Sequence, residues 1–251
     1  MISLRLRSIR EYNRLYANVL NLLWHLQGRD SARVYMFHSV LNDRADVYSE
    51  FAISSASFEK FLEFELARGQ KPMTETNLRK AVDCPREFDN HFAVSFDDIY
   101  DSIYINAYPV LKRLGIPFTI FVTPDLIDKI DPASKNPMIS LSHLRELMDD
   151  ELCIVGSHGV EHKVFRYYSE SEALSSMEKS KVILNRETGI FAFPYGRRVE
   201  VSGRDIKCAE KAGYFCAFSA LDGSLKQKWF SGRWFLPRIR VGEDYVKRHV
   251  K

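Results

Sequence analysis

The sequence predicts an α/β protein with a largely parallel sheet, because apolar strand-like runs alternate with helix-like segments along most of the chain. Two of these runs, residues 91–96 and 152–156, are apolar and β-prone, and each is followed directly by polar side chains. Polar groups at the carboxyl ends of buried parallel strands mark the functional edge of α/β barrels and of open α/β sheets. We therefore expect the chemistry of this protein at that edge.

The helices are identified by a polar cap at the start and a glycine near the end. Ser57 is the expected cap of a helix that runs to Leu66 and ends at Arg68-Gly69. Further helices are expected over residues 140–148, 169–188 and 202–212. Strands should follow near residues 190–193 and 215–219, and long loops are expected at 83–90, 125–137 and 221–232.

Length and composition fit one folded domain over residues 30–251, preceded by a separate segment over residues 1–29. With 45% hydrophobic residues, the 251-residue chain can bury one sizeable core. The net charge of +3 is too small to favour nucleic acid, and no lysine-rich block suggests such a partner.

The four cysteines are dispersed and show no metal-binding spacing, so we expect reduced structural thiols. No segment has the form of a signal peptide, and no apolar run approaches the length of a membrane span. These features favour the cytoplasm.

Residues 1–29 are expected to form an amphipathic helix, because apolar side chains recur at steps of three and four residues. Arginines cluster at its start and Trp24 lies near its end. A basic helix with an aromatic anchor can lie on the inner face of an anionic membrane as a peripheral contact. The alternative, which we favour, is that it packs on the folded domain or on a partner subunit.

The most informative residues are the adjacent pair Asp97-Asp98 and, after a long gap, His158 and His162. Asp98 and the two histidines provide the three ligands of a zinc-type catalytic site, which leaves one position for water. Asp97 is then a second carboxylate that can accept a proton from water acidified by the metal. The set predicts metal-assisted hydrolysis with one divalent metal, zinc first and cobalt or nickel as alternatives.

Other interpretations of the same residues exist. Residues 158–162 also fit the His-x-x-Glu-His pattern of inverted zinc peptidases, in which Glu161 would be the base. That pattern requires a helix, whereas Gly156 and Gly159 favour a strand followed by a loop. A peptidase would also leave the Asp pair without a role. The simplest alternative is a solvated Asp-Asp turn and two unrelated histidines.

At these positions the chain resembles the polysaccharide deacetylases, the NodB-homology domain of carbohydrate esterase family four. Residues 95–98 resemble the first family motif, whose first Asp is the base and whose second binds metal. Residues 157–162 resemble the second motif and 191–196 the third, in which the residue after Pro194, here Tyr195, gives a backbone N–H to the oxyanion. The resemblance covers roughly residues 32–242 and implies a distorted (β/α) barrel of about seven parallel strands.

Three positions depart from the family pattern. Gly159 stands where the second motif has Ser or Thr, which removes a hydroxyl but no ligand. Ala192 stands where the third motif often has an Arg that orients the base. The usual C-terminal Leu-x-His, the source of the acid histidine, is missing, and only His249 lies near the end.

Residues 34–40 offer a replacement for the acid, because they form an apolar strand that ends at His38. They resemble the opening of permuted family members that deacetylate biofilm poly-N-acetylglucosamine, and residues 51–54 and 58–62 fit the same subgroup. The resemblance makes His38 the general acid; otherwise it only bonds a neighbouring carbonyl. Arg238 is a candidate for the missing partner of Asp97; the alternative is an ordinary ion pair elsewhere. Arg238, Pro194 and Tyr195 are also the candidates for the oxyanion and substrate site.

The resemblance implies a metal-dependent N-deacetylase that hydrolyses the acetamide of an N-acetylated carbohydrate and releases acetate. Four aromatic residues are candidates for stacking on a sugar ring or for ordinary packing: Tyr100, Tyr104, Tyr195 and Trp234. The second hypothesis is a non-catalytic, glycan-binding relative that keeps the metal site, because a fold alone does not secure an activity.

Overall fold

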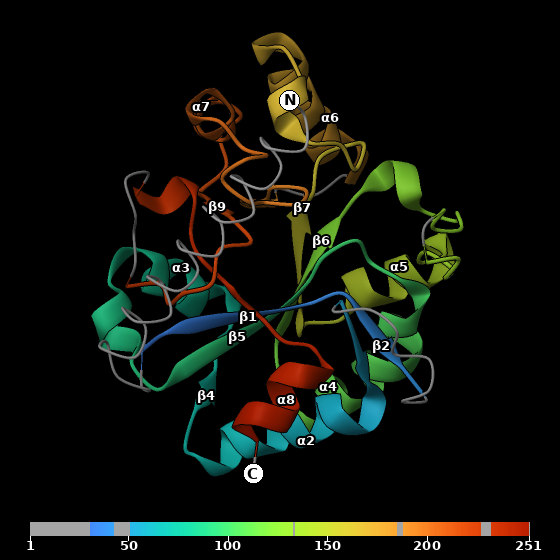
Figure 1. The fold of residues 1–251 in the computed structure, drawn as a ribbon, viewed down its shortest axis with the longest axis vertical. Coiled ribbons are helices and arrows are strands. Elements are labelled where there is room, and N and C mark those ends of the chain that lie inside the picture. The colour runs from blue at the N-terminus through green and yellow to red at the C-terminus, as the bar shows by residue number, and fades with distance from the viewer. Residues whose placement is uncertain (1–30, 43–50, 133, 185–187, 227–231, 251) are drawn as a thin grey trace, which may run out of the picture.

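Short, mostly buried strands form a parallel sheet that curls around a central axis (Figure 1). The main path of the sheet is β10-β1-β5-β6-β7-β8-β9, and β4 pairs with the start of β5. A second, two-stranded sheet consists of β2 and β3. The strands are β1 (Arg33–Phe37), β2 (Ser39–Leu41), β3 (Ala52–Ser54), β4 (Lys71–Pro72), β5 (His91–Phe96), β6 (Phe118–Val122), β7 (Cys153–Ser157), β8 (Ile190–Ala192), β9 (Cys216–Phe218) and β10 (Ile239–Arg240).

The computed structural model describes residues 31–42, 51–132, 134–184, 188–226 and 232–250. The amphipathic helix predicted for residues 1–29, with its two alternative roles, lies outside these ranges. Within them, no helix combines the length and the apolar character needed to cross a membrane. Cys84, Cys153, Cys208 and Cys216 form no disulfide in the described ranges, as expected for reduced thiols.

The segment before β10 joins the two edges of the curled sheet. Leu236 pairs in parallel with Phe218 of β9, and Ile239 pairs with Tyr35 of β1. The Ser219 N–H donates to the Leu236 carbonyl at 2.8 Å, and the Val241 N–H donates to the Met36 carbonyl at 3.0 Å. The expected distorted barrel of about seven parallel strands is therefore confirmed, with residues 236–240 as its closing segment.

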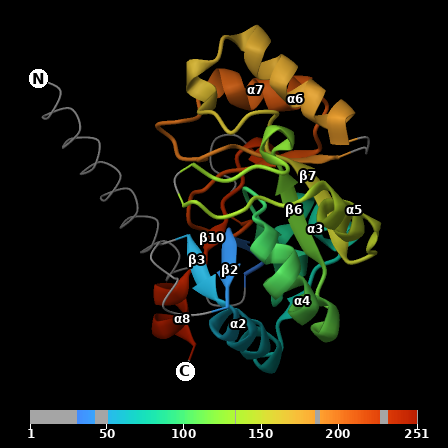
Figure 2. The ribbon, with the colours of Figure 1, turned by 90° about the vertical axis from the view of Figure 1, so that its right-hand side faces the viewer.

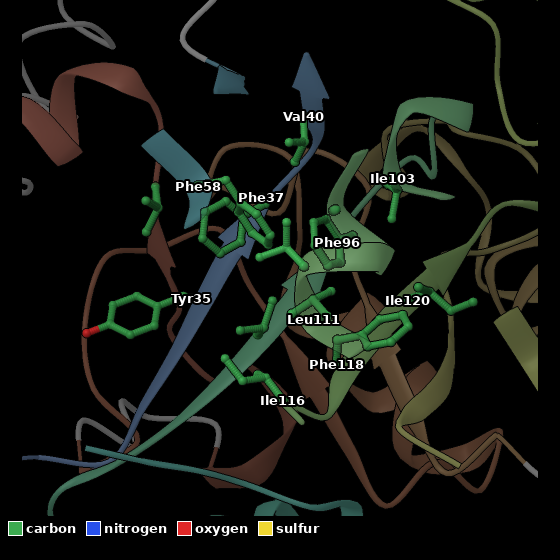
Figure 3. Close-up of a cluster of buried hydrophobic side chains, with 14 of the residues drawn as sticks. Tyr35, Phe37, Val40, Phe58, Phe96, Ile103, Leu111, Ile116, Phe118 and Ile120 are labelled. Carbon is green, nitrogen blue, oxygen red and sulfur yellow. The ribbon is translucent and has the colours of Figure 1, made fainter. Parts of the chain in front are cut away.

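Alternation along the strands separates an outer core from an inner core. Tyr35 and Phe37 of β1 and Phe96 of β5 belong to the outer cluster, which packs against Phe58 of α2 (Ser55–Ala67). Figure 3 shows Phe37, Phe58 and Phe96 gathered in this cluster. Because successive side chains point to opposite faces, His38 and Asp97, which follow Phe37 and Phe96, fall on the interior side.

Seven helices are described, and they surround the sheet. They are α2 (Ser55–Ala67), α3 (Glu75–Asp83), α4 (Tyr108–Leu114), α5 (Leu141–Asp149), α6 (Glu170–Leu184), α7 (Gly203–Lys211) and α8 (Glu243–His249). Figure 2 shows α2, α4 and α8 near one end of the molecule and α6 and α7 at the other.

The helix starts were predicted with one error. The cap of α2 is Ser54 and not Ser57, because the Ser57 N–H donates to the Ser54 hydroxyl at 3.2 Å. Ser54 has the extended backbone that a cap requires, whereas Ser57 is already helical. Ser140 and Ser202 cap α5 and α7, in agreement with the expected starts. The helix predicted for 169–188 has ended before Thr188, since Thr188 is not helical.

Candidate active site

The candidate residues meet at the carboxyl edge of the barrel. Asp97 and Asp98 follow β5, His158 follows β7, and His38 follows β1. The registers Phe37↔Phe96 and Val122↔Ser157 place these strand ends side by side. The carboxyl ends of parallel strands lie at one edge of the sheet, so residues that follow three strands distant in sequence share one site.

Asp97 is held by Arg238 in a bidentate ion pair. Arg238 Nη1 donates to Asp97 Oδ1 and Nη2 donates to Oδ2, both at 2.7 Å, and Nε donates to the Ser219 carbonyl at 2.9 Å. The Arg238 side chain is 0% exposed and lies 5.2 Å from the Phe121 ring centroid. Because the buried guanidinium donates to Asp97, Ser95 and Ser219, Arg238 is placed to hold Asp97.

The arginine also sets the charge state of Asp97. Burial alone would raise the pKa of this carboxyl group, but the Arg238 guanidinium, helped by His158, outweighs burial and holds the pKa below its usual value. Asp97 is therefore ionised at neutral pH. Each carboxylate oxygen has a second lone pair, so the pair with Arg238 leaves capacity to accept a further proton.

Asp98, His158 and His162 form a candidate metal-ligand set. Asp98 Oδ1 lies 2.9 Å from His162 Nε2 and 3.5 Å from His158 Nε2. One ligand atom from each of the three residues lies within 4.8 Å of the other two. The Asp98 backbone has φ +61°, a left-handed conformation that Asp tolerates better than most residues. This turn separates the direction of Asp98 from that of Asp97.

His158 is oriented by the backbone of β8. Its Nδ1 lies 2.8 Å from the Ala192 carbonyl, and because a carbonyl can only accept, Nδ1 carries the proton. The Nε2 lone pair is therefore directed toward Asp98. This second hydrogen bond is the usual way in which proteins fix the tautomer of a metal-binding histidine. Ala192 thus contributes its carbonyl at the position where the family often has an Arg side chain.

The donor set fits a zinc-type divalent cation. Asp98 Oδ1 is buried and makes no hydrogen bond of acceptable geometry, although two imidazole nitrogens are close to it. Burial raises the pKa of Asp98, but the nearby His158 and His162 outweigh it and hold the pKa well below its usual value. Lone pairs of one carboxylate and two imidazoles that converge in this way are the ligands of a three-residue zinc site.

Gly159 has a local reason to replace the Ser or Thr of the family motif. Its φ is +80°, a region that favours glycine. A Cβ at this position would also lie 3.3 Å from the Phe165 ring. The loop from His158 to His162 is not helical, so the expected strand-to-loop site is present and the helix of the peptidase pattern is not.

Glu161, the base in the peptidase interpretation, is engaged elsewhere. Its Oε2 accepts a hydrogen bond from the Tyr168 hydroxyl at 3.0 Å, and the carboxylate pairs with Lys163. Its side chain is 42% exposed. Neither contact involves the metal-ligand set, so the geometry does not support the peptidase hypothesis.

His38 lies beside Asp97 on the neighbouring strand. The Asp97 N–H donates to the Phe37 carbonyl, directly before His38, at 3.0 Å. His38 Nδ1 is buried and has no hydrogen-bond partner among the described residues. Burial lowers the pKa of His38, and although the charges of Asp98 and Asp97 oppose this effect, the pKa remains below its usual value. His38 therefore shares the electrostatic environment of the carboxylates.

Tyr195, which follows β8, lies on the other side of the candidate metal ligands from His38, which follows β1. Its backbone has φ +61°, its ring centroid is 4.6 Å from that of His162, and the residue is 47% exposed. The Gly196 N–H donates to the buried Pro194 carbonyl at 2.7 Å, and a Cβ on Gly196 would lie 2.6 Å from the Ala220 nitrogen. Within the described parts of the chain, the Tyr195 N–H donates to no protein acceptor.

The other candidate residues have structural partners. Tyr104 stacks on His143 with centroids 4.0 Å apart, and the Tyr100 hydroxyl donates to Asp131 Oδ2 at 3.0 Å. Trp234 packs against the core cluster between α6, α7 and the sheet. His249, on α8, stacks on Tyr245 at 4.1 Å. Phe51, whose ring lies 4.9 Å from that of His38, was not recognised from the sequence as a site residue.

Comparisons with known proteins agree with this geometry. The family model for polysaccharide deacetylase matches residues 87–217, which is more than half of the chain. A poly-beta-1,6-N-acetyl-D-glucosamine N-deacetylase from Staphylococcus epidermidis is 25% identical over 247 residues, which covers 89% of this chain and 83% of the relative.

Two solved structures share the fold. IcaB from Ammonifex degensii superposes with a TM-score of 0.71 at 23% identity, covering 87% of this chain and 95% of IcaB. The Streptococcus pyogenes deacetylase PplD gives 0.70 at 20% identity, covering 88% of this chain and 98% of PplD. The two structures share the fold, and the family model over more than half of the chain shows that the chain belongs to the polysaccharide deacetylase family, as the motifs predicted.

Proposed function

We propose that the protein is a metal-dependent N-deacetylase that hydrolyses the acetamide of an N-acetylated sugar within a glycan or glycan precursor and releases acetate. The observation that carries the proposal is the ionised Asp97, fixed by Arg238, directly beside the Asp98-His158-His162 ligand set. A base and a metal site in contact, at the open edge of a barrel, are the parts that hydrolysis requires.

Asp98, His158 and His162 would hold one divalent cation, with zinc first and cobalt or nickel as alternatives. When bound, such a cation supplies Lewis-acid polarisation of the acetamide carbonyl and acidifies water. Asp97 accepts the proton of the attacking water as the new C–O bond forms. Arg238 keeps the carboxylate ionised until this transfer and holds it in one orientation, which is a positioning role.

Two further groups complete the reaction. The Tyr195 backbone N–H donates a hydrogen bond to the oxygen that becomes negative when the carbonyl is attacked. His38 gives a proton to the nitrogen as the C–N bond breaks, so that an amine and not an amide anion leaves. The products are acetate and the free amino sugar.

A non-catalytic glycan-binding relative was the second hypothesis, and it depended on the missing Arg of the third motif. Arg238 supplies a guanidinium to Asp97 from the closing segment instead. The geometry therefore favours an active enzyme.

The test is acetate release from oligomers of β-1,6-linked N-acetylglucosamine, chosen because of the name of the Staphylococcus epidermidis relative. Chelator-treated protein should be inactive, and zinc, cobalt or nickel should restore activity. The Asp97→Asn variant is the negative control. Equal acetate release from the treated protein, with and without metal, would contradict metal dependence, and no release from any N-acetylated glycan would favour the binding protein.

A further inference from the structure

Phe51 exposes an aromatic ring beside the candidate acid. The residue is 44% exposed, although Ala52 and Ile53, which follow it in β3, are buried. Its ring centroid lies 4.9 Å from that of His38, with the two rings inclined by 63°. A single exposed aromatic residue is common on a protein surface and needs no explanation. This one contacts a histidine that lies near the charges of Asp98, Asp97 and Arg238.

The ring is held in place and is not part of the core. The Phe51 carbonyl accepts the Ser39 N–H at 3.2 Å, which fixes the backbone to β2. The Arg240 guanidinium lies 5.2 Å from the ring centroid. Phe51 belongs to none of the buried hydrophobic clusters of the described residues. Phe51 therefore presents a preorganised apolar surface, and a ligand that binds it does not have to order the side chain.

A second exposed ring lies across the site. Tyr195 contacts His162 at 4.6 Å and is 47% exposed. In the strand order β10-β1-β5-β6-β7-β8-β9, closed by residues 236–240, β1 and β8 lie on nearly opposite sides of the barrel. Phe51 is attached to the β1 side and Tyr195 to the β8 side. The two rings therefore flank the metal-ligand set from different directions.

We infer that Phe51 is a substrate-contacting residue that binds the apolar face of a sugar on the side of the leaving amine, opposite Tyr195. This inference rests on the proposed function. Pyranose rings have one face of C–H groups that packs on aromatic rings, and Phe offers only this apolar contact because it lacks a polar atom. The position of His38 indicates which side of the substrate Phe51 contacts. His38 donates the proton to the leaving nitrogen, and its ring contacts the ring of Phe51. In this arrangement Phe51 positions the sugar, and His38 protonates the leaving nitrogen.

An alternative role is that Phe51 only shields His38 from solvent. A shield acts through the acid, so its removal would change kcat and the alkaline side of the pH–rate profile. A sugar contact acts on binding, so its removal would raise KM and leave the profile in place. The two roles can therefore be separated by kinetics.

The experiment compares Phe51→Ala, Phe51→Trp and wild type, all as full-length metal-loaded protein, on N-acetylglucosamine oligomers. Phe51→Ala should raise KM about three- to tenfold, the effect of losing one aromatic contact, with kcat within about twofold. Phe51→Trp should restore KM. Tyr167→Ala is the matched control, because Tyr167 is an aromatic residue that is 85% exposed and lies outside the candidate site. An unchanged KM, or a lower kcat with a shifted profile, would overturn the inference.

A second readout does not depend on turnover. Calorimetric binding of an N-acetylglucosamine pentamer to Asp97→Asn and to the Asp97→Asn, Phe51→Ala double variant should show the same three- to tenfold loss of affinity. If wild type releases no acetate but the double variant binds more weakly, the proposed function fails and the contact stands. If both proteins bind equally, the contact fails whatever the activity.

Discussion

Arg238 and Asp97 form a two-pronged ion pair across 141 residues of sequence, with both N–O distances at 2.7 Å. The pair joins the segment that closes the barrel to the end of β5. It gives a buried carboxylate a fixed orientation and keeps it ionised. Arg238 supplies this guanidinium from the closing segment, whereas the position of Ala192, at which the resemblance led us to expect an Arg, provides only a carbonyl.

Replacement of Arg238 by Lys should lower kcat/KM about 10- to 100-fold, the usual cost of losing a residue that orients a catalytic group. An ammonium cannot reproduce the planar two-point contact with the carboxylate. Metal content should not change, because Arg238 contacts no metal ligand. Arg233→Lys is the control, since Arg233 pairs with Asp83 on the surface. Equal activity of the two variants would show that the two-point contact between Arg238 and Asp97 is not needed.

The metal site is tested by the double substitution His158→Ala and His162→Ala. One remaining carboxylate is too few ligands for a tight zinc-type site, so the variant should lose the single bound metal ion that we expect for wild type. Metal content after dialysis, measured by elemental analysis, checks this. Circular dichroism should show an intact fold. The same metal content in both proteins would refute the ligand assignment.

Asp97→Asn should retain the metal and lose acetate release, because an amide cannot accept the proton of water at neutral pH. Glu161→Gln should retain most of the activity, since Glu161 bonds Tyr168 and Lys163 outside the site. Acetate release and metal content are measured for both variants. The reverse pattern, with Glu161 essential and Asp97 dispensable, would favour the peptidase.

His38→Ala should lower turnover by about a hundred- to ten-thousandfold with metal binding retained, as for the loss of a general acid. His249→Ala is the matched control, because His249 stacks on Tyr245 of its own helix, α8. Both rates are measured on the same oligomer at saturating metal. A wild-type rate for His38→Ala would contradict the role of His38 as the proton donor to the leaving amine.

The stability of the metal-free protein should depend on pH through Asp97. Its pKa in the folded state lies below the unfolded value of about 3.9, so the ion pair with Arg238 contributes stability above that value. This contribution is lost as the pH falls through the folded pKa. Asp97→Asn should therefore be about 3 kcal/mol less stable than wild type at pH 7, and the difference should shrink below about pH 4. Urea unfolding of both proteins in the presence of a chelator, at pH 7 and below about pH 4, measures this difference in the free energy of unfolding.

The meeting of the candidate metal ligands and the candidate base at one edge of the sheet was predictable because their signals are local. Asp97 and Asp98 directly follow one apolar run, and His158 directly follows another, so the parallel sheet brings them together. The barrel followed from the same alternation and from the resemblance to the family. These features depend on short stretches of sequence.

The features that sequence analysis missed or left open depend on distant contacts. Arg238 was a candidate partner of Asp97 with an ordinary ion pair as the alternative, and only the pairing of residues 236–240 with both sheet edges places it against Asp97. The cap of α2 was misplaced because Ser54, Ser55 and Ser57 are all able to cap, and the backbone conformation decides between them. Phe51 belonged to a stretch that resembles the permuted subgroup, but its contact with His38 depends on the folded position of the segment before β3 and was not predicted.

The closing segment has a consequence for the order in which the protein can fold. β1, which leads to His38, pairs on one side with β5 and on the other with β10, which follows Arg238. A chain still on the ribosome with residues 236–240 inside the exit tunnel could already contain both aspartates and both metal-binding histidines. It could not yet orient its base. Pairing between such distant strands is slow to form, so catalytic competence should arise late in folding, after the ability to bind metal.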